Sequence, residues 1–348
     1  MPSKNKDLHK AAKDKKDEFY TQLPVIENEL KYYKDHFEDK VVYCNCDDPR
    51  ISNFFHYFSY KFEELGLKEL ISSCYKNQNM DLFSQNDAEQ AVYLKYDGDK
   101  NRNLIPDPEE IGINYFKGDG DFRSKESIEL LKQADIIVTN PPFSLFREYV
   151  AQLVEYDKKF LIIGNVNAIS YKETFKLIKE NKMWLGASIH SGDREFGVPD
   201  DYPLKAAGYR IDGKGRKFIR VKGVRWFTNL DFKERHEDLI LYKTYTPDEY
   251  PKYDNYDAIE VSQTNDIPTD YDGAMGVPIT FLDKYNPDQF EILGITDRDN
   301  NSGLKTKEYT KDDVPNPGDL NRRGVIKIGN EYKSTYARLL IKRRKLWK

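Results

Sequence analysis

The ten residues from Ala134 to Phe143 (ADIIVTNPPF) constrain the fold of this chain more than any other stretch. Ile136, Ile137 and Val138 form a short β-branched run, of the kind that a parallel sheet buries on both faces. Two prolines then remove backbone donors and fix φ, so the strand cannot continue. The apolar residues from Ser144 to Val150 have helical spacing. The turn after the strand should therefore lie at the carboxyl end of a buried strand, where open α/β sheets bind ligands.

The chemistry of that turn is specific. Asn140 brings a side-chain carbonyl and Pro141 a backbone carbonyl, and the turn can aim both acceptors at one exocyclic amine. Two acceptors hold the hydrogens of an NH2 group and direct the nitrogen lone pair at an electrophile, and Phe143 offers a face on which a base can stack. The sequence resembles the (Asp/Asn/Ser)-Pro-Pro-(Tyr/Phe/Trp) catalytic loop of amino-methyltransferases. We predict four catalytic residues, namely Asn140, Pro141, Pro142 and Phe143. A turn that merely ends a strand is the alternative.

Strand and helix patterns alternate at short intervals on both sides of this stretch. Predicted strands cover residues 41–46, 67–75, 91–96 and 159–164, and predicted helices cover 24–37, 53–65, 124–133 and 170–181. This alternation predicts an α/β fold with a doubly wound, mostly parallel sheet. Further strands are expected at 183–186, 217–221, 224–228 and 324–328. Residues 107–116 are expected to be irregular, 244–269 a long surface connection, and 296–323 a polar loop.

A length of 348 residues is long for one domain and short for three. We expect a frayed N-terminus at residues 1–16 and a catalytic domain at residues 17–240. Residues 241–348 are expected to form a target-recognition region.

Charge and composition exclude several classes of protein. The chain has 55 Lys and Arg against 59 Asp and Glu, a net charge of −4, so any basic surface has to be local. Three cysteines and five histidines without metal-ligand spacing argue against a disulfide framework and against a metal site. No apolar run approaches the roughly 18 residues of a membrane span, and no secretory h-region is present. We expect a cytoplasmic protein.

An amino-methyltransferase needs S-adenosylmethionine beside its catalytic loop. The usual glycine-rich turn after the first strand is absent, and Asn45-Cys46-Asp47-Asp48-Pro49 stands in its place. A carboxylate at this strand end can accept from the amino group of the cofactor, and the amides of the next helix can reach its carboxylate. Alternatively, Asp47 and Asp48 only cap that helix.

Two further motifs resemble those of adenine methyltransferases. Phe19-Tyr20-Thr21 is similar to the aromatic-aromatic-Thr motif that touches the methionine end of the cofactor. Gly120-Asp121-Phe122 is similar to the Asp-Phe pair that follows the third strand, which implies that Asp121 accepts from the cofactor adenine amine while Phe122 packs on its ring. Asp119 competes for the carboxylate role.

Taken in order, these motifs are similar to those of the EcoRI-type adenine-specific DNA methyltransferase family, from about residue 17 to the C-terminus. The resemblance implies a Rossmann-like fold, S-adenosylmethionine as cofactor, and methyl transfer to N6 of adenine in a short duplex DNA site. The strand ending at Cys74-Tyr75 departs from the wider class, because it lacks an acid for the cofactor ribose. The predicted cofactor-binding residues are Tyr20, Thr21, Asn45, Cys46, Asp47, Asp48, Asp119, Asp121 and Phe122.

An adenine inside a duplex has to flip out to reach such a site. From Asn321 to Lys348 the chain has ten Lys or Arg against one acid, which is the charge pattern expected at a phosphate backbone, although a solvated basic tail has the same composition. Residues 191–196 are expected to form a loop near the flipped base, unless they are only a charged surface loop. The predicted DNA-binding residues are Arg194, Phe196, Arg322, Arg323, Arg343, Arg344 and Lys345.

The function predicted from the sequence is DNA adenine N6 methylation within restriction–modification or phage or host DNA protection. Cytosine N4 methylation, and methylation of an RNA base or a glutamine amide, use the same loop chemistry and stay open as alternatives. Cytosine C5 chemistry is disfavoured, because no cysteine follows a proline. A non-enzymatic DNA-binding protein is disfavoured by the intact loop. Expected partners are duplex DNA and a cognate restriction endonuclease that acts on the same site without a stable complex.

Overall fold

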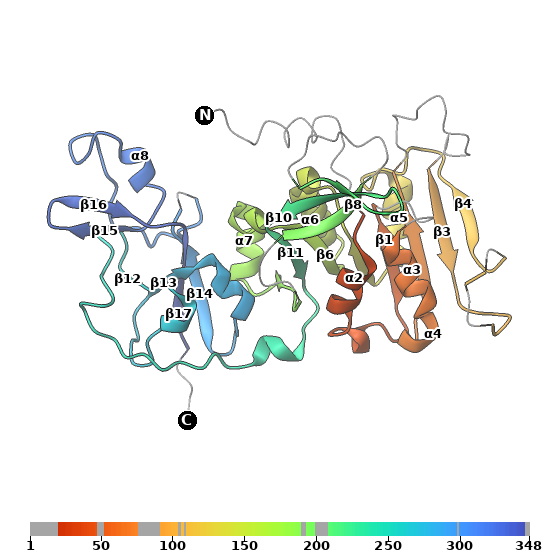
Figure 1. Cartoon of the computed structure of the whole chain (residues 1–348), viewed down its shortest axis with the longest axis horizontal. Helices are drawn as coiled ribbons and strands as arrows, with labels where there is room; N and C mark the ends of the chain where they lie inside the picture. The colour runs from red at the N-terminus through yellow and green to blue at the C-terminus, as the bar shows by residue number, and fades with distance from the viewer. Residues whose placement is uncertain are drawn as a thin grey trace. The chain divides into compact units, whose positions relative to one another are not determined.

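The computed structural model describes residues 20–46, 52–75, 91–103, 106–107, 109–188, 193–198, 208–297 and 299–344. The chain forms two compact units: Met1–Val166 with Gly186–Asp231, and Asn167–Leu185 with Phe232–Lys348 (Figure 1). The predicted functional division at residue 240 stays a prediction, and residues 1–16 lie outside the described residues. No helix in the described part of the chain has the length and apolar character needed to cross a membrane.

The first unit is built on a mixed sheet with the strand order β4-β3-β2-β1-β5-β6-β11. Parallel pairing joins the central four strands, β1 (Val41–Asn45), β2 (Glu69–Ser73), β5 (Ile136–Thr139) and β6 (Lys159–Asn165). Antiparallel strands complete both sides, β3 (Val92–Tyr96), β4 (Gly112–Tyr115) and β11 (Val224–Thr228). The predicted α/β fold is confirmed. The irregular segment predicted at 107–116 is wrong for residues 112–115, because β4 forms there as an exposed strand on β3.

Helices cover both faces of this sheet. They are α2 (Leu23–Leu30), α3 (Asn53–Tyr60), α4 (Phe62–Leu65), α5 (Lys125–Gln133) and α6 (Phe146–Glu155), with 3-10 turns η1 (Lys34–His36) and η2 (Phe143–Leu145). Ser52 and Ser124 cap α3 and α5 with their side chains, and Gly66 ends α4 in the left-handed conformation.

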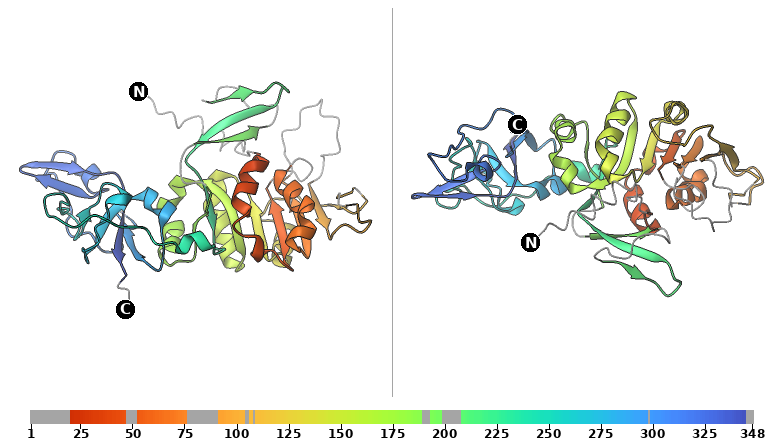
Figure 2. Two further views of the ribbon diagram at one scale, coloured as in Figure 1. Left: turned by 60° about the horizontal axis from the view of Figure 1, so that its bottom comes forward. Right: turned by 90° about the horizontal axis from the view of Figure 1, so that it is seen from above.

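The parallel strands run outward from the centre of the sheet in two directions. The crossover from β1 through α3 leads to β2 on one side, and the crossover from β5 through α6 leads to β6 on the other. Right-handed crossovers in opposite directions place their helices on opposite faces, as Figure 2 shows for α3 and α6. The strand order therefore reverses between β1 and β5, and their carboxyl ends flank the position where such sheets bind ligands.

A small antiparallel sheet also belongs to the first unit. Its strand order is β8 (Asp193–Val198), β10 (Lys217–Lys222) and β9 (Arg210–Ile211). The predicted strand at 217–221 is confirmed. The loop predicted at 191–196 is wrong for residues 193–196, since β8 pairs with β10 over six residues, from Lys217↔Val198 to Lys222↔Asp193.

The second unit contains a four-stranded sheet and a hairpin. The sheet has the order β12 (Ile259–Glu260), β13 (Met275–Pro278), β17 (Arg338–Arg343) and β14 (Phe290–Ile295), and the hairpin joins β15 (Val325–Ile328) to β16 (Glu331–Ser334). The remaining elements are α7 (Lys172–Lys179), β7 (Trp184–Leu185), α8 (Pro317–Leu320) and the 3-10 turns η3 (Val166–Ser170), η4 (Lys233–His236), η5 (Thr264–Asp266) and η6 (Ile279–Lys284).

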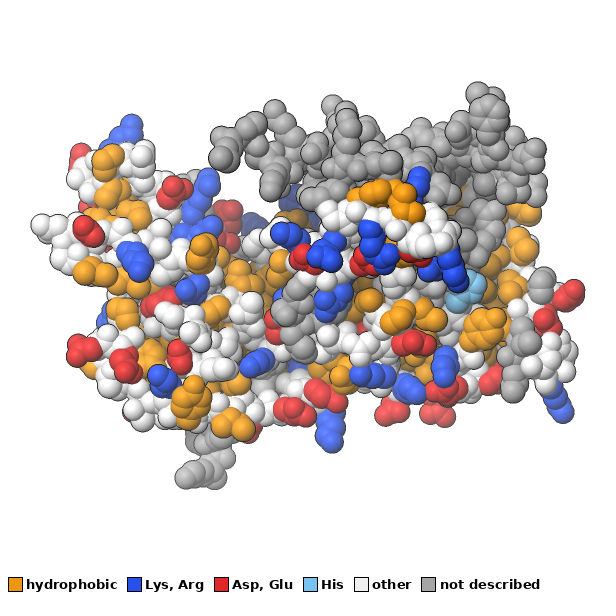
Figure 3. Space-filling view, viewed as in Figure 1, with side chains coloured by type: hydrophobic (Ala, Val, Ile, Leu, Met, Phe, Trp, Pro, Cys, Tyr) orange, Lys and Arg blue, Asp and Glu red, His pale blue; other side chains and the backbone are white. Residues whose placement is uncertain are grey.

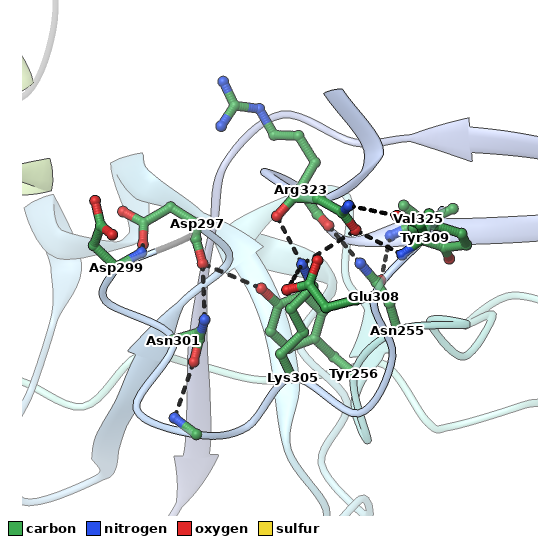
Figure 4. Close-up of polar contacts among 12 residues, drawn as sticks. Asn255, Tyr256, Asp297, Asp299, Asn301, Lys305, Glu308, Tyr309, Arg323 and Val325 are labelled. Atoms are coloured by element: carbon green, nitrogen blue, oxygen red, sulfur yellow. Dashed lines mark hydrogen bonds and ion pairs between the residues drawn. The ribbon is translucent and has the colours of Figure 1, made fainter. Parts of the chain in front are cut away.

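Two segments of this unit are more buried than their polar composition predicts. The surface connection predicted at 244–269 is wrong, because Tyr253, Tyr256, Ile259 and Val261 lie in the core. The polar loop predicted at 296–323 contains α8, the buried Tyr309 and the largely buried Lys305 side chain. Tyrosines fill the core there while Asn, Asp and Lys side chains satisfy backbone groups (Figure 4).

Candidate active site

The Asn-Pro-Pro-Phe turn occupies the predicted strand–turn–helix position. β5 ends at Thr139, the 3-10 turn Phe143–Leu145 follows the two prolines, and α6 begins at Phe146. Asn140 is only 6% exposed at the carboxyl end of β5, whereas Phe143 is half-buried. A buried polar acceptor beside a partly accessible ring suits capture of an amine-bearing base. The context is confirmed, and the catalytic roles of the four residues stay predictions.

The end of β1 is tied directly to the end of β5 and to α6. The Thr139 hydroxyl donates to the Asn45 backbone carbonyl, and the Tyr149 hydroxyl donates to Asn45 Oδ1. Burial raises the pKa of Tyr149, which therefore stays a neutral donor. The chain leaves β1 through Cys46, whose φ of +84° starts a sharp turn. The predicted cofactor residues Asn45 and Cys46 thus adjoin the catalytic turn, while Asp47 and Asp48 lie outside the described residues.

The segment carrying Asp121 and Phe122 approaches the same edge of the sheet. Gly120 has a φ of +72°, and a Cβ there would collide with the Cys74 carbonyl oxygen after β2, so only glycine fits. Phe122 is 8% exposed, and its ring packs edge-on against Tyr149 with centroids 5.1 Å apart. Tyr149 therefore links the predicted adenine-packing ring to Asn45.

The Asp121 carboxylate has a strong partner that the sequence reasoning missed. Arg123 Nε lies 2.8 Å from Asp121 Oδ1 and Arg123 Nη2 lies 2.7 Å from Asp121 Oδ2. The hydrogen bonds to Asp121 raise the pKa of Arg123, which also reaches Glu148 at 3.0 Å. A cofactor amine would have to share Asp121 with this guanidinium. Asp119 accepts from the Asp121 backbone N–H at 3.0 Å through one oxygen.

Tyr20 and Thr21 lie beside the same region. Tyr20 exchanges two backbone hydrogen bonds with Gly197 of β8, at 2.8 and 2.9 Å. Thr21 is buried, and its carbonyl accepts from Asn53 Nδ2 at 2.7 Å at the start of α3, which follows β1. The motif therefore bridges the small sheet and the helix after the first strand. Its contact with the methionine end of a cofactor stays a prediction.

A family model described as "Adenine-specific methyltransferase EcoRI" matches residues 7–344. The chain belongs to the EcoRI adenine-specific methyltransferase family. It is 56% identical to the type II methyltransferase M.EcoRI of Escherichia coli over 301 residues, which cover 85% of this chain and 92% of that protein. The type II methyltransferase M.MgeORF184P of Mycoplasma genitalium is 37% identical over 97% of this chain and 99% of its own length. The type II methyltransferase M.MpnI of Mycoplasma pneumoniae is 39% identical over 82% of this chain and 84% of its own length.

As a member of the EcoRI adenine-specific methyltransferase family, the chain is an adenine-specific DNA methyltransferase. The predicted family and enzyme class are confirmed. Membership decides against the cytosine, RNA-base and glutamine alternatives that the loop chemistry alone left open. Among the described residues, no group of three or more His, Cys, Asp or Glu side chains could hold a metal.

The predicted DNA contacts of this EcoRI-family chain need correction. Phe196 is 1% exposed on β8, so its ring belongs to the core and has no surface to offer DNA. Arg194, on the same strand, is half-buried, and its Nη1 donates to the Asp193 carbonyl at 3.0 Å. Lys345 lies outside the described residues. Of Arg194, Phe196 and Lys345, only Arg194 has a described position compatible with DNA, and its contact with DNA stays a prediction.

The basic C-terminal residues do not form one cluster. Arg343 pairs with Phe290 at one end of the β14–β17 ladder, and Arg344 Nε donates to the Pro287 carbonyl at 2.7 Å. Arg323 lies toward the other end of the ladder. Its carbonyl accepts a hydrogen bond from Asn255. The next residue, Tyr256, donates from its hydroxyl to the carbonyl of Asp297, which follows β14. The ladder residues between these ends span roughly 17 Å. Figure 4 shows the Arg323 side chain pointing away from the network that anchors its backbone.

Proposed function

We propose that this chain transfers a methyl group from S-adenosylmethionine to N6 of an adenine flipped out of a specific duplex DNA site. The observation that carries the proposal is the position of buried Asn140 at the carboxyl end of β5. It adjoins the end of β1 where the strand order reverses. A hydrogen-bond acceptor held where the strand order reverses can contact a base on one side and lie next to a cofactor on the other.

The chain's own residues perform the orienting chemistry in this proposal. Asn140 Oδ1 and the Pro141 carbonyl accept the two hydrogens of the adenine amine, and Phe143 stacks on the ring. The nitrogen lone pair then points at the methyl group. S-adenosylmethionine supplies that methyl group as an electrophile, so the amine needs no prior deprotonation. The flip costs a few kcal/mol, which contacts with the base and the backbone must offset.

The described residues fit such a cofactor. Phe122 presents a ring braced by Tyr149, with the carboxylates of Asp119 and Asp121 beside it, which suits an adenine and its amine. Asn45 and Cys46 lie at the strand end where the amino-acid portion would be held. Tyr20 and Thr21 complete the set. A cognate endonuclease that acts on the same site without a stable complex, and a cytoplasmic location, remain part of the proposal.

The product should be N6-methyladenine, formed only when S-adenosylmethionine is supplied. Family membership and the Asn-Pro-Pro-Phe loop motivate this expectation. DNA from a host without methylation, incubated with the protein and then digested to nucleosides, should show the modified base by mass spectrometry. Reactions without cofactor are the control. N4-methylcytosine in place of N6-methyladenine would contradict the proposal.

The double variant Arg322→Gln/Arg323→Gln should bind duplex DNA with a weaker salt dependence. Arg322 is exposed, and the backbone of Arg323 is fixed by buried Asn255. Each lost phosphate contact flattens the slope of log K against log salt by about 0.9. A salt series in fluorescence anisotropy measures this slope, and affinity for S-adenosylhomocysteine should not change.

The matched control is Arg344→Gln, because the Arg344 guanidinium already donates to the backbone carbonyls of Pro287 and Phe290. The Arg344→Gln variant should have a lower Tm than the wild type, whereas its slope of log K against log salt should stay close to the wild-type slope. If the Arg322/Arg323 variant keeps the wild-type slope, that pair is only a solvated basic turn.

A further inference from the structure

We propose that the small sheet β8-β10-β9 is a DNA-binding arm that holds backbone phosphates over the active-site edge of the main sheet. The arm is defined here as residues 193–198 and 208–222. The inference rests on the proposed function, because it assigns a second surface to the same duplex substrate.

The arm is strongly basic within an acidic chain. Its residues include seven Lys or Arg and three Asp or Glu, a balance of +4, whereas the whole chain carries −4. In Figure 3 the Lys and Arg side chains gather over β8 and β10, with acidic side chains among them. A local excess of cations on a chain of opposite net charge is the electrostatic footprint of a polyanion site.

Ion pairs use only part of this charge. Arg210 is bound to Glu195 and Arg216 to Asp212, and both guanidinium groups lie over the Phe218 ring, at 4.4 and 5.7 Å. Every acid of the arm other than Asp193 is therefore engaged in an ion pair on the arm itself. The hydrogen bond with Arg210 lowers the pKa of Glu195, and Arg220, which faces Glu195 across the ladder, lowers it further. The arm therefore has more cations than its own acids can neutralise.

Three cations are available for DNA phosphates. Within the part of the chain that the structure describes, Lys214, Arg220 and Lys222 are exposed and take part in no ion pair. Arg220 and Lys222 are two residues apart on β10, so they share one face at a separation of roughly 6.8 Å. Ile219, which points to the other face, is buried. The sheet thus buries the face that carries Ile219 and Phe196. Its other face carries Arg220 and Lys222 opposite Glu195 and Asp193 of β8, and Glu195 is already bound to Arg210.

The attachment of the arm places the root of β10 at the active-site edge of the main sheet. β10 ends at Lys222, and Gly223, with a φ of +68°, turns the chain into β11. Val166 N, just beyond β6, donates to the Gly223 carbonyl at 2.6 Å, and Asn165 Nδ2 donates to the Lys222 carbonyl at 2.9 Å. The root of β10 is therefore at the carboxyl end of β6. The neighbouring strand β5 ends at Thr139, the residue before Asn140.

A second attachment holds the arm at β8. Tyr20 pairs with Gly197, and the buried Glu29 carboxylate of α2 accepts from the Ala187 and Ser188 backbone N–H groups at 2.8 and 2.7 Å, on the chain that leads into β8. Burial raises the pKa of Glu29 despite these hydrogen bonds. Figure 2 shows the arm standing off the main sheet. Both β8 and β10 are therefore attached by hydrogen bonds to the rest of the first unit.

The test compares Arg220→Gln/Lys222→Gln with the control Lys40→Gln/Lys159→Gln. The control removes two exposed lysines, Lys40 just before β1 and Lys159 at the start of β6. Both lie at the amino ends of the parallel strands, whereas the active site lies at their carboxyl ends. Anisotropy of a labelled duplex of arbitrary sequence is measured across a salt series with S-adenosylhomocysteine present. The arm variant should flatten the log–log slope by about 1.8, so that it loses about tenfold less affinity between 50 and 200 mM salt. The control should keep the wild-type slope.

The expected cause of the flatter slope is the loss of positive charge. The double variant Arg220→Lys/Lys222→Arg keeps both charges, so it should have the wild-type slope. Equal slopes for the arm variant, the control and the wild type would overturn the inference while leaving the proposed function standing, provided that the wild type still methylates DNA. A wild-type protein that neither binds nor methylates duplex DNA would instead overturn the proposed function itself, and the inference with it.

Discussion

Replacing Asn140 with alanine is expected to lower kcat by about 10²–10³ while affinity for S-adenosylhomocysteine stays unchanged. Asn140 is buried at the end of β5, where its side-chain oxygen is one of two acceptors for the amine in the proposed reaction. Without it the amine loses the contact that orients its lone pair. The chain around Asn140 is fixed by two prolines and by the Thr139–Asn45 hydrogen bond, so the site should keep its shape.

Single-turnover methylation and calorimetric titration separate the two effects. The conservative variant Asn140→Asp keeps a side-chain acceptor and should retain more activity than Asn140→Ala. Glu155→Gln, at an exposed position at the end of α6, should behave as the wild type. An Asn140→Ala protein with more than about a tenth of the wild-type kcat would remove Asn140 from the mechanism.

Replacing Glu260 with alanine is expected to lower the free energy of unfolding by about 3–5 kcal/mol. Glu260 is 5% exposed on β12 and accepts from Arg338 Nε at 3.0 Å and Nη2 at 2.7 Å. The Tyr253 hydroxyl donates to the same carboxylate. Removal of the carboxylate leaves a largely buried guanidinium without a counter-charge. The free-energy cost of that unpaired charge is larger than the net stabilisation that the intact pair contributes.

Denaturant unfolding followed by circular dichroism measures this effect. The double variant Glu260→Leu/Arg338→Met replaces the pair with apolar groups, so it should be less destabilised than Glu260→Ala alone. A single variant that loses under about 1 kcal/mol would mean that water screens the pair as at an exposed site.

Those parts of the fold that depend on local signals could be predicted from the sequence. The β-branched runs of β1, β5 and β6 are bounded by proline, glycine or charge, and Ser52, Ser124 and Gly66 mark helix ends by their own chemistry. β4 and β8 carry polar or charged residues, and only a partner strand makes them strands. The sequence of either one alone has no feature that shows its partner.

The candidate site shows the same distinction. The Asn-Pro-Pro-Phe turn is contiguous, so its position could be predicted. Tyr149 joins Asn45 to Phe122, yet in the sequence it is one apolar position on the buried face of α6. Arg338 is one of the ten cations of the basic C-terminal stretch, yet it pairs with Glu260, 78 residues away. A charge count cannot distinguish a cation that faces solvent from one held by a distant acid.

The second unit draws residues 167–185 from the middle of the chain, which restricts how such proteins can exchange parts. Phe175 and Ile178 of α7 are buried, Asn300 Nδ2 donates to the Ser170 carbonyl at 3.0 Å, and Lys179 reaches Ser302. A hybrid gene made from two relatives with a single junction near residue 231 would therefore combine the α7 segment of one parent with the β14 region of the other. A working hybrid needs three junctions, near residues 166, 186 and 231. Both stretches of the second unit are then inherited together from one parent.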